Sequence, residues 1–170
     1  MNNKTVLAWG FIIIVLGGLI WWSKTSTATD SAAAKPAVVN NASGFLAASE
    51  TFYDFGTISM KNGDVSHVFK VTNQTGTDIM VATLNTSCMC TSASIVRSDG
   101  SINGPFGMPG MGYVPPANEL IKAGETRDIK VVYNPNAHGP AGVCAIDRFI
   151  YLKDAQDRTL QLEIKAVVTP

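Results

Sequence analysis

The strongest constraint on the fold lies near the end of the chain, in residues 159–168, where apolar and polar side chains alternate. Successive side chains of a β-strand point to opposite faces, so this segment predicts a half-buried strand with one apolar face. The apolar positions of this face are Leu160, Leu162, Ile164, Ala166 and Val168. Shorter alternating runs occur at 65–71, 79–83, 129–133 and 144–152.

Turn signals such as Asn134-Pro135 separate these runs, and no sustained helical period follows residue 24. Several short strands with turns between them are typical of a sandwich of two sheets. We therefore predict an all-β fold, an immunoglobulin-like antiparallel β-sandwich that spans residues 44–170. This length suits one such domain of about 100 residues with an enlarged loop.

Residues 5–23 carry no charge, and most of them are apolar. A helix of this length crosses a hydrocarbon core of about 30 Å, and Trp21 and Trp22 suit its interface with water. The alternative is a cleaved signal peptide, whose apolar core is normally about 7–15 residues long. Because the apolar run is longer than that, we favour an uncleaved transmembrane signal anchor over residues 1–24.

Residues 25–43 are rich in Ser, Thr and Ala and predict a flexible tether. Lys4 and Lys24 flank the apolar run symmetrically, so charge does not set the orientation of the span in the membrane. Because most of the chain follows the span, we expect the C-terminal part to be translocated across the membrane. We expect a single-pass protein of the inner or cytoplasmic membrane, with its domain in the periplasm or on the cell surface.

The charges of the chain balance, with 13 Lys plus Arg and 13 Asp plus Glu. The composition therefore gives no basic surface that would predict nucleic-acid binding.

A set of short motifs resembles one bacterial family, the domain-of-unknown-function family 1573. The motifs are FYDFGTI at 52–58, GDVSHVFKVTN at 63–73, SCMCT at 87–91, AGE at 123–125 and YNP at 133–135. The resemblance extends over roughly residues 50–168 and implies an exported or membrane-anchored immunoglobulin-like domain, without an established activity. Met89 stands where the family usually has Gly between its two cysteines, and the segment 98–118 is longer than usual.

The segment 98–118 is dense in Gly and Pro, which are uncommon inside a sheet. We expect it to form a long surface loop, and such loops in small domains are often functional. It carries four large apolar residues that could contact a partner: Phe106, Met108, Met111 and Tyr113.

The three cysteines allow four interpretations. Outside the cytoplasm, Cys144 could form a disulfide with Cys88 or Cys90, and this interpretation leads. A direct bridge within Cys88-Met89-Cys90 is disfavoured if the backbone is extended, since the Cα atoms then lie about 6.6 Å apart. The cysteines could also be reduced and inert, or form a redox dithiol, which has the least support because no Cys-x-x-Cys motif opens a helix.

The fourth interpretation is a soft-metal site. Thiolates on Cys88 and Cys90 would bind Cu(I), a cation that prefers sulfur ligands. The remaining ligand would come from Met108, Met111, His138 or Cys144. The spacing of the two cysteines lacks the second ligand pair of a zinc signature.

Other polar residues suggest no chemistry. His67 shares an apolar face with Val65 and Phe69, and we expect it to be a hydrogen-bonded residue at a sheet edge. Asp147 and Arg148 are interpreted as ordinary strand charges.

Because no catalytic constellation occurs, the leading function is a non-enzymatic interaction or scaffold domain that contacts another envelope protein. Copper binding or delivery is the alternative, and a thiol-redox role is third.

Overall fold

The computed structural model describes residues 45–170. The predicted anchor (1–24), including the membrane-spanning run 5–23, and the predicted tether (25–43) lie outside the described residues. Within residues 45–170, no helix has the length and apolar character of a membrane span.

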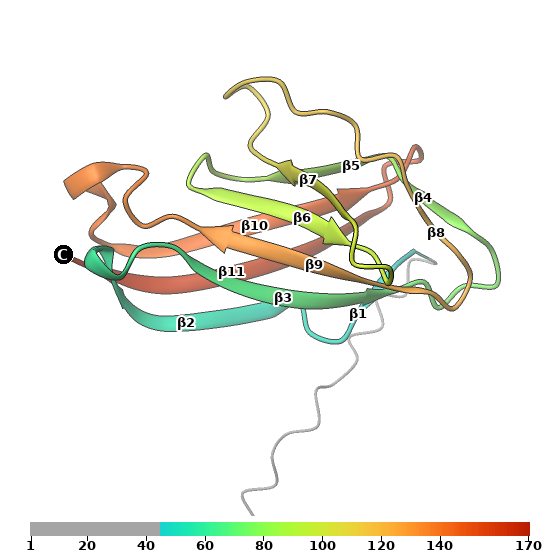
Figure 1. Cartoon of the computed structure of the whole chain (residues 1–170), viewed down its shortest axis with the longest axis horizontal. Helices are drawn as coiled ribbons and strands as arrows, with labels where there is room; N and C mark the ends of the chain where they lie inside the picture. Colours follow the sequence, from blue (N-terminus) through green and yellow to red (C-terminus); the bar gives the residue numbers. More distant parts are fainter. Residues whose placement is uncertain (1–44) are drawn as a thin grey trace, which may run out of the picture. The chain divides into compact units, whose positions relative to one another are not determined.

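The described part of the chain is all-β, as predicted, with two short 3₁₀ turns (Figure 1). Its elements in order are β1 (Ala47–Ala48), β2 (Phe52–Ser59), η1 (Met60–Asn62), β3 (Val65–Thr72), β4 (Ile79–Val81), β5 (Thr83–Thr86), β6 (Thr91–Val96), β7 (Ile102–Phe106), β8 (Glu119–Ile121), β9 (Thr126–Tyr133), η2 (Gly139–Gly142), β10 (Ala145–Lys153) and β11 (Thr159–Thr169).

The strands form a sandwich of two main sheets, which confirms the predicted β-sandwich. One sheet has the strand order β1-β3-β9-β6-β7, and the other has the order β2-β11-β10-β5. Strands β4 and β8 make a separate two-stranded sheet. All pairs are antiparallel except β2 with β11, which is parallel and departs from the predicted antiparallel pattern. These two strands are far apart in sequence, so no hairpin connection dictates their relative direction.

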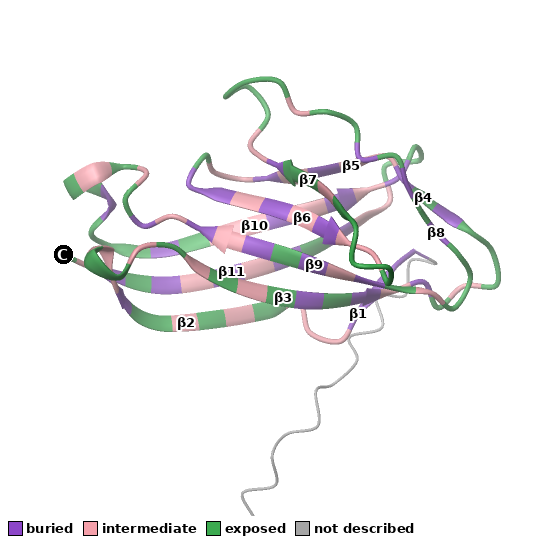
Figure 2. Ribbon diagram, viewed as in Figure 1, coloured by how far each residue is buried: buried purple, intermediate pink, exposed green. Residues whose placement is uncertain are grey.

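The core lies between the two main sheets, and buried positions alternate with more exposed ones along strands such as β9 and β11 (Figure 2). In β11, the five apolar positions predicted from the alternation are all buried. In β9, Ile129, Val131 and Tyr133 point into the core as well. The alternation of the sequence therefore identified the inner faces of these strands.

The segment 98–118 departs from its predicted form. Residues 102–106 form β7, which pairs with β6 at the edge of its sheet, despite the Gly and Pro in this stretch. An edge strand tolerates Pro because one side of its backbone needs no ladder partner. The surface loop is therefore shorter than expected and runs from residue 107 to residue 118, as the excursion between β7 and β8 in Figure 1 shows.

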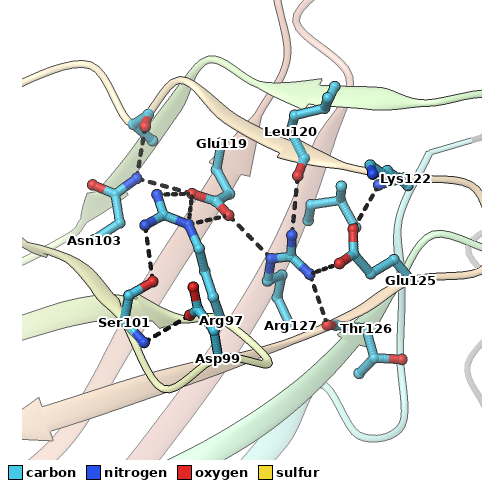
Figure 3. Close-up of polar contacts among 12 residues, drawn as sticks. Arg97, Asp99, Ser101, Asn103, Glu119, Leu120, Lys122, Glu125, Thr126 and Arg127 are labelled. Carbon is cyan, nitrogen blue, oxygen red and sulfur yellow. Dashed lines mark hydrogen bonds and ion pairs between the residues drawn. The ribbon is translucent and has the colours of Figure 1, made fainter.

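One buried carboxylate fixes the start of β8 (Figure 3). The Glu119 side chain is only 2% exposed, and it accepts hydrogen bonds from Arg97 on both oxygens and from Arg127 on one. The Asn103 amide donates a further bond at 3.1 Å. Burial alone would raise the pKa of Glu119, but the hydrogen bonds from Arg97, Arg127 and Asn103 lower it overall. This network ties β6, β7, β8 and β9 together.

Candidate functional site: a cysteine pair beside His138 and Arg148

The two neighbouring cysteines lie in the connection between β5 and β6, which crosses from one main sheet to the other. The backbone N–H of Thr91 donates to the carbonyl of Cys88 at 3.1 Å, so residues 88–91 form a reverse turn rather than an extended segment. The hydroxyl of Thr86, which is buried, donates to the carbonyls of Cys88 and Thr91. The turn is thus fixed from inside the domain.

Both neighbouring sheets hold this turn in place. The Ser87 N–H donates to the Phe149 carbonyl of β10 at 2.9 Å, and the Phe149 N–H donates back to the Ser87 hydroxyl. On the other side, the Asn134 N–H at the end of β9 donates to the Cys90 carbonyl at 2.8 Å. The cysteines therefore lie on a connection whose position is set by β9 and β10.

The structure pairs Cys88 with Cys90 as a disulfide, with Cα atoms 5.2 Å apart. The sequence analysis disfavoured this bridge on the condition that the backbone is extended. The backbone instead forms a reverse turn, which brings the two Cα atoms closer together than a strand would. Cys144 is a free, exposed thiol. The sequence analysis favoured a bridge from Cys144 to Cys88 or Cys90. The structure instead joins Cys88 to Cys90.

The imidazole of His138 lies against the first sulfur of the pair, 3.2 Å from Nε2 to Sγ of Cys88. His138 directly precedes η2, and Gly139 after it has a φ of +56°, a conformation that suits glycine. Gly142 packs closely under this loop, since an added Cβ there would lie 3.1 Å from the Pro135 carbonyl. The η2 loop thereby presents His138, an exposed residue, at the cysteine turn.

The second sulfur has a different neighbour. Arg148 of β10 directs its Nε–H at Sγ of Cys90, with a distance of 3.2 Å. The Thr91 hydroxyl lies 3.7 Å from the same sulfur. Cys90 is 2% exposed, whereas Cys88 is half-buried, so the two residues of one bridge differ in their exposure to solvent.

Arg148 is the residue that the sequence interpretation missed. We expected an ordinary strand charge, but its side chain points inward while Asp147 is exposed and pairs with Lys165. A signal was present, because Arg148 occupies the same alternating face as Ile146 and Ile150, which are both buried. A charged residue on an inward face needs a polar partner, and here that partner is a cysteine sulfur.

Tyr133, at the end of β9, completes the inner wall of this region. Burial raises the pKa of its phenol, an effect to which the nearby Cys144 adds and which Arg148 opposes. Tyr133 is paired in register with Thr91, the residue after Cys90. The site thus has an apolar interior and an exposed rim on the His138 side.

This arrangement can support two kinds of chemistry. Sγ of Cys88, Sγ of Cys90 and a ring nitrogen of His138 all lie within 4.8 Å of one another, so three candidate metal ligands are close together. The two sulfurs are bonded to each other in this structure, so they could act as separate metal ligands only after the disulfide is reduced. A disulfide with unequal neighbours is also suited to thiol–disulfide exchange.

The other predicted ligands are not part of this cluster. Among the described residues, the group of possible metal ligands that includes Cys88 contains neither Cys144 nor any carboxylate. Met108 and Met111 belong to the loop after β7, where Met111 is exposed and Met108 is partly buried. Cys144 donates to the Gly142 carbonyl at 3.7 Å.

Of the four predicted interaction residues, one is buried, Met108 is partly buried and two are exposed. Phe106 is 1% exposed and belongs to the core, so its assignment to a contact surface is wrong. Met111 and Tyr113 are 58% and 87% exposed. The reason is that Phe106 ends β7 and faces inward, whereas the two others lie beyond the strand.

His67 behaves as expected. Its Nε2 lies 2.7 Å from a carboxylate oxygen of Glu50, and its ring stacks on Tyr53 with centroids 3.6 Å apart. The hydrogen bond is confirmed, and so is the edge position, because β1 pairs only with Val71 and Thr72 of β3, and His67 pairs with β9 alone among the described strands. Nothing in this environment indicates a ligand or a base.

Solved structures share this fold. A protein of unknown function from Porphyromonas gingivalis W83 matches with a TM-score of 0.53 at 15% identity, over 73% of this chain and 46% of that one. The chain therefore spans less than half of that protein. The secreted serine protease VesC from Vibrio cholerae (TM-score 0.47, 13% identity, 76% and 25% coverage) and the periplasmic chaperone SfaE (0.35, 15%, 74% and 57%) are too distant to inform function.

No curated protein matches the chain. A family model, "Protein of unknown function (DUF1573)", matches residues 46–101, a range that contains β1 to β6 and both paired cysteines but neither His138 nor Arg148. This match covers about a third of the chain and agrees with the resemblance of its motifs to the domain-of-unknown-function family 1573.

Proposed function

We propose that this protein is a membrane-anchored, extracytoplasmic immunoglobulin-like domain that acts as a non-enzymatic interaction or scaffold module. The uncharged run at 5–23 supports the anchor and its place in the inner or cytoplasmic membrane. The partner is another protein of the cell envelope, bound through the loop between β7 and β8.

The observation that carries the proposal is the exposure of Tyr113, 87% of whose side chain is open to solvent. Met111 lies two residues before it and is 58% exposed. Tyrosine and methionine are enriched at protein interfaces, because a large side chain there gains much contact area. Two such exposed residues on one loop are suited to contact a partner.

The loop is held at both ends, which limits the entropy lost on binding. Before it, Phe106 is buried in the core. After it, the Ala117 N–H donates to the Ala82 carbonyl at 2.8 Å, and Asn103 donates to the Ala117 carbonyl at 2.8 Å. Deleting the whole loop together with Phe106 would disturb the core, so single substitutions are the better test.

The experiment places a photo-crosslinking aromatic amino acid at Tyr113 in the full chain, expressed in its native cells. We expect a crosslinked adduct with a second envelope protein, and its loss when Met111→Ser is added. The control carries the same amino acid at Lys61, an exposed residue of η1. The proposal fails if the adduct at Tyr113 is no stronger than at Lys61, or if it joins only two copies of this chain.

A second candidate function rests on a separate observation, the closeness of two sulfurs and one imidazole. When reduced, Cys88 and Cys90 supply two thiolates, and His138 supplies a nitrogen ligand. This set fits Cu(I), which favours thiolate ligands and accepts a low coordination number. Two thiolates and Cu(I) carry one net negative charge, which the guanidinium of Arg148 offsets. The candidate is therefore a copper-binding or copper-delivery domain.

A further inference from the structure

The two sulfurs of the Cys88–Cys90 bridge differ in how a reactant from solution can reach them. Cys88 is half-buried and adjoins His138, an exposed residue on the η2 loop. Cys90 is 2% exposed and lies against the domain interior. Thiol–disulfide exchange begins with a thiolate that approaches one sulfur, so access selects the sulfur that is attacked. Here Cys88 is the more exposed of the two residues.

The two sulfurs also differ in how well they can leave. When a thiolate attacks Cys88, the sulfur–sulfur bond breaks and its electron pair goes to Sγ of Cys90. The Arg148 Nε–H points at this sulfur from 3.2 Å, and a charge-assisted hydrogen bond is stronger to an anion than to a neutral sulfur. The charge that develops on Cys90 is therefore stabilised as the bond breaks.

Arg148 is suited to this role because no carboxylate competes for it. Among residues 45–170, the ion pairs do not include Arg148. Its other hydrogen bond goes to the backbone carbonyl of Asp147, whose carboxylate pairs with Lys165 instead. The full charge of the guanidinium thus remains available to the sulfur of Cys90.

We propose that the Cys88–Cys90 bridge is a thiol–disulfide exchange centre that oxidises a dithiol of a partner protein. One partner thiolate attacks Sγ of Cys88, forms a mixed disulfide and releases Cys90 as a thiolate. The second partner thiolate attacks the partner's own sulfur in that mixed disulfide and releases Cys88. The partner loses two electrons and two protons and gains a disulfide, while Cys88 and Cys90 become two thiols.

This activity goes beyond the proposed interaction module, and it does not depend on the loop between β7 and β8. It also has a direct relation to the copper candidate, because the dithiol that the exchange produces is the form that can supply two thiolates to Cu(I). A protein dithiol is preferred over a single thiol as the reductant, since its second step is intramolecular.

The first test determines which sulfur reacts. All variants of the full chain carry Cys144→Ser, which removes the exposed free thiol. The reduced Cys90→Ser variant leaves Cys88 alone, and the reduced Cys88→Ser variant leaves Cys90 alone. Each is mixed with an aromatic disulfide reagent that releases a coloured thiolate. We expect Cys88 to react at least about tenfold faster than Cys90. Equal rates, or a faster Cys90, would overturn the assignment of Cys88 as the attacked sulfur.

The second test measures how much Arg148 stabilises the leaving sulfur of Cys90. The oxidised Cys144→Ser protein is opened by dithiothreitol, and the rate is followed by quenching with an alkylating agent and measuring the mass. We expect Arg148→Gln to slow opening by about tenfold to a hundredfold, the range expected from loss of a hydrogen bond to a charged group. Arg148→Lys retains the positive charge and should recover most of the rate.

The matched control is Lys165→Gln, which removes an exposed cation of the neighbouring strand β11. We expect its rate to stay within about twofold of the parent protein. The proposal is overturned if Arg148→Gln opens as fast as the parent, or if Lys165→Gln slows opening equally. If Arg148→Gln does not fold, Arg148→Lys and the single-cysteine comparison decide the question. A failure of the crosslinking experiment at Tyr113 would contradict the proposed interaction function, but it would not bear on the exchange centre.

Discussion

The Nε atom of Arg148 lies 3.2 Å from Sγ of Cys90, and this contact joins the inner face of β10 to the turn between β5 and β6. It gives one sulfur of the Cys88–Cys90 pair a cationic neighbour, while the other sulfur has His138. A charged side chain that points inward from a strand is costly without a polar partner. The cysteine turn and Arg148 therefore form one structural unit, from which the following predictions derive.

His138→Ala should weaken Cu(I) binding by the reduced protein. Loss of one of three ligands is expected to raise the dissociation constant by at least about tenfold, since even a group supporting a ligand typically matters by 10–100-fold. The measurement is competition with a coloured Cu(I) chelator, with the full chain reduced beforehand. His67→Ala is the matched control, because His67 is the other histidine of the chain and contacts Glu50. Equal affinity of His138→Ala and His67→Ala would exclude an imidazole ligand.

Phe106→Ala and Tyr113→Ala should have very different effects on the free energy of unfolding. Phe106 is a buried core residue, so its truncation should lower the free energy of unfolding by about 3–5 kcal/mol. Tyr113 is mostly exposed, so its truncation should change that free energy by no more than about 0.5 kcal/mol. Chemical denaturation of both variants measures the difference. A strong destabilisation by Tyr113→Ala would mean that the residue packs on the domain rather than on a partner.

Glu119→Gln should destabilise the domain strongly at neutral pH. The substitution leaves Arg97 and Arg127 without their shared carboxylate, and breaking such a buried pair typically costs about 3–5 kcal/mol. We expect the lower end of this range, because the Arg97 side chain is 36% exposed and can regain hydration. Urea denaturation at pH 7 provides the value, and Asp128→Asn, which affects only a surface pair with Lys70, serves as the control. Equal effects of the two substitutions would contradict the structural role of Glu119.

The effect of Glu119→Gln should disappear in acid. The folded protein holds the pKa of Glu119 below its ordinary value, so its carboxylate contributes stability that is fully present above the unfolded pKa of about 4.3. This contribution is lost as the pH falls through the lower, folded pKa, because the protonated group can no longer accept from both arginines. The difference in unfolding free energy between the two proteins should therefore shrink below about pH 4. A difference that stays constant from pH 7 to pH 3 would contradict this account.

The alternation of single strands made much of the fold predictable. Leu160, Leu162 and Ile164 defined the inner face of β11 because a half-buried strand imposes a period of two. The same rule could have placed Arg148 inward, but its charge was interpreted as an ordinary strand charge. Strand β7 could not be predicted, since Gly104 and Pro105 interrupt any pattern and the strand depends on pairing with β6.

The candidate site was predictable only in part. The spacing of Cys88 and Cys90 identified the two sulfurs, and His138 was among the possible ligands. Their relative placement depends on contacts between segments about fifty residues apart in the sequence, which no local pattern encodes. The reverse turn at 88–91 was also missed, because Met89 gives no turn signal of the kind that Gly or Asn provides.

The most direct test of the account is to map the thiols of the full chain purified under oxidising conditions. Free thiols are alkylated without reduction, and proteolytic peptides then show by mass spectrometry which cysteine carries the label. Counting alone does not suffice, since any single bridge among three cysteines leaves one free thiol. We predict that the label is on Cys144 and that Cys88 and Cys90 are linked to each other. A label on Cys88 or Cys90, with the other joined to Cys144, would contradict the proposed exchange centre.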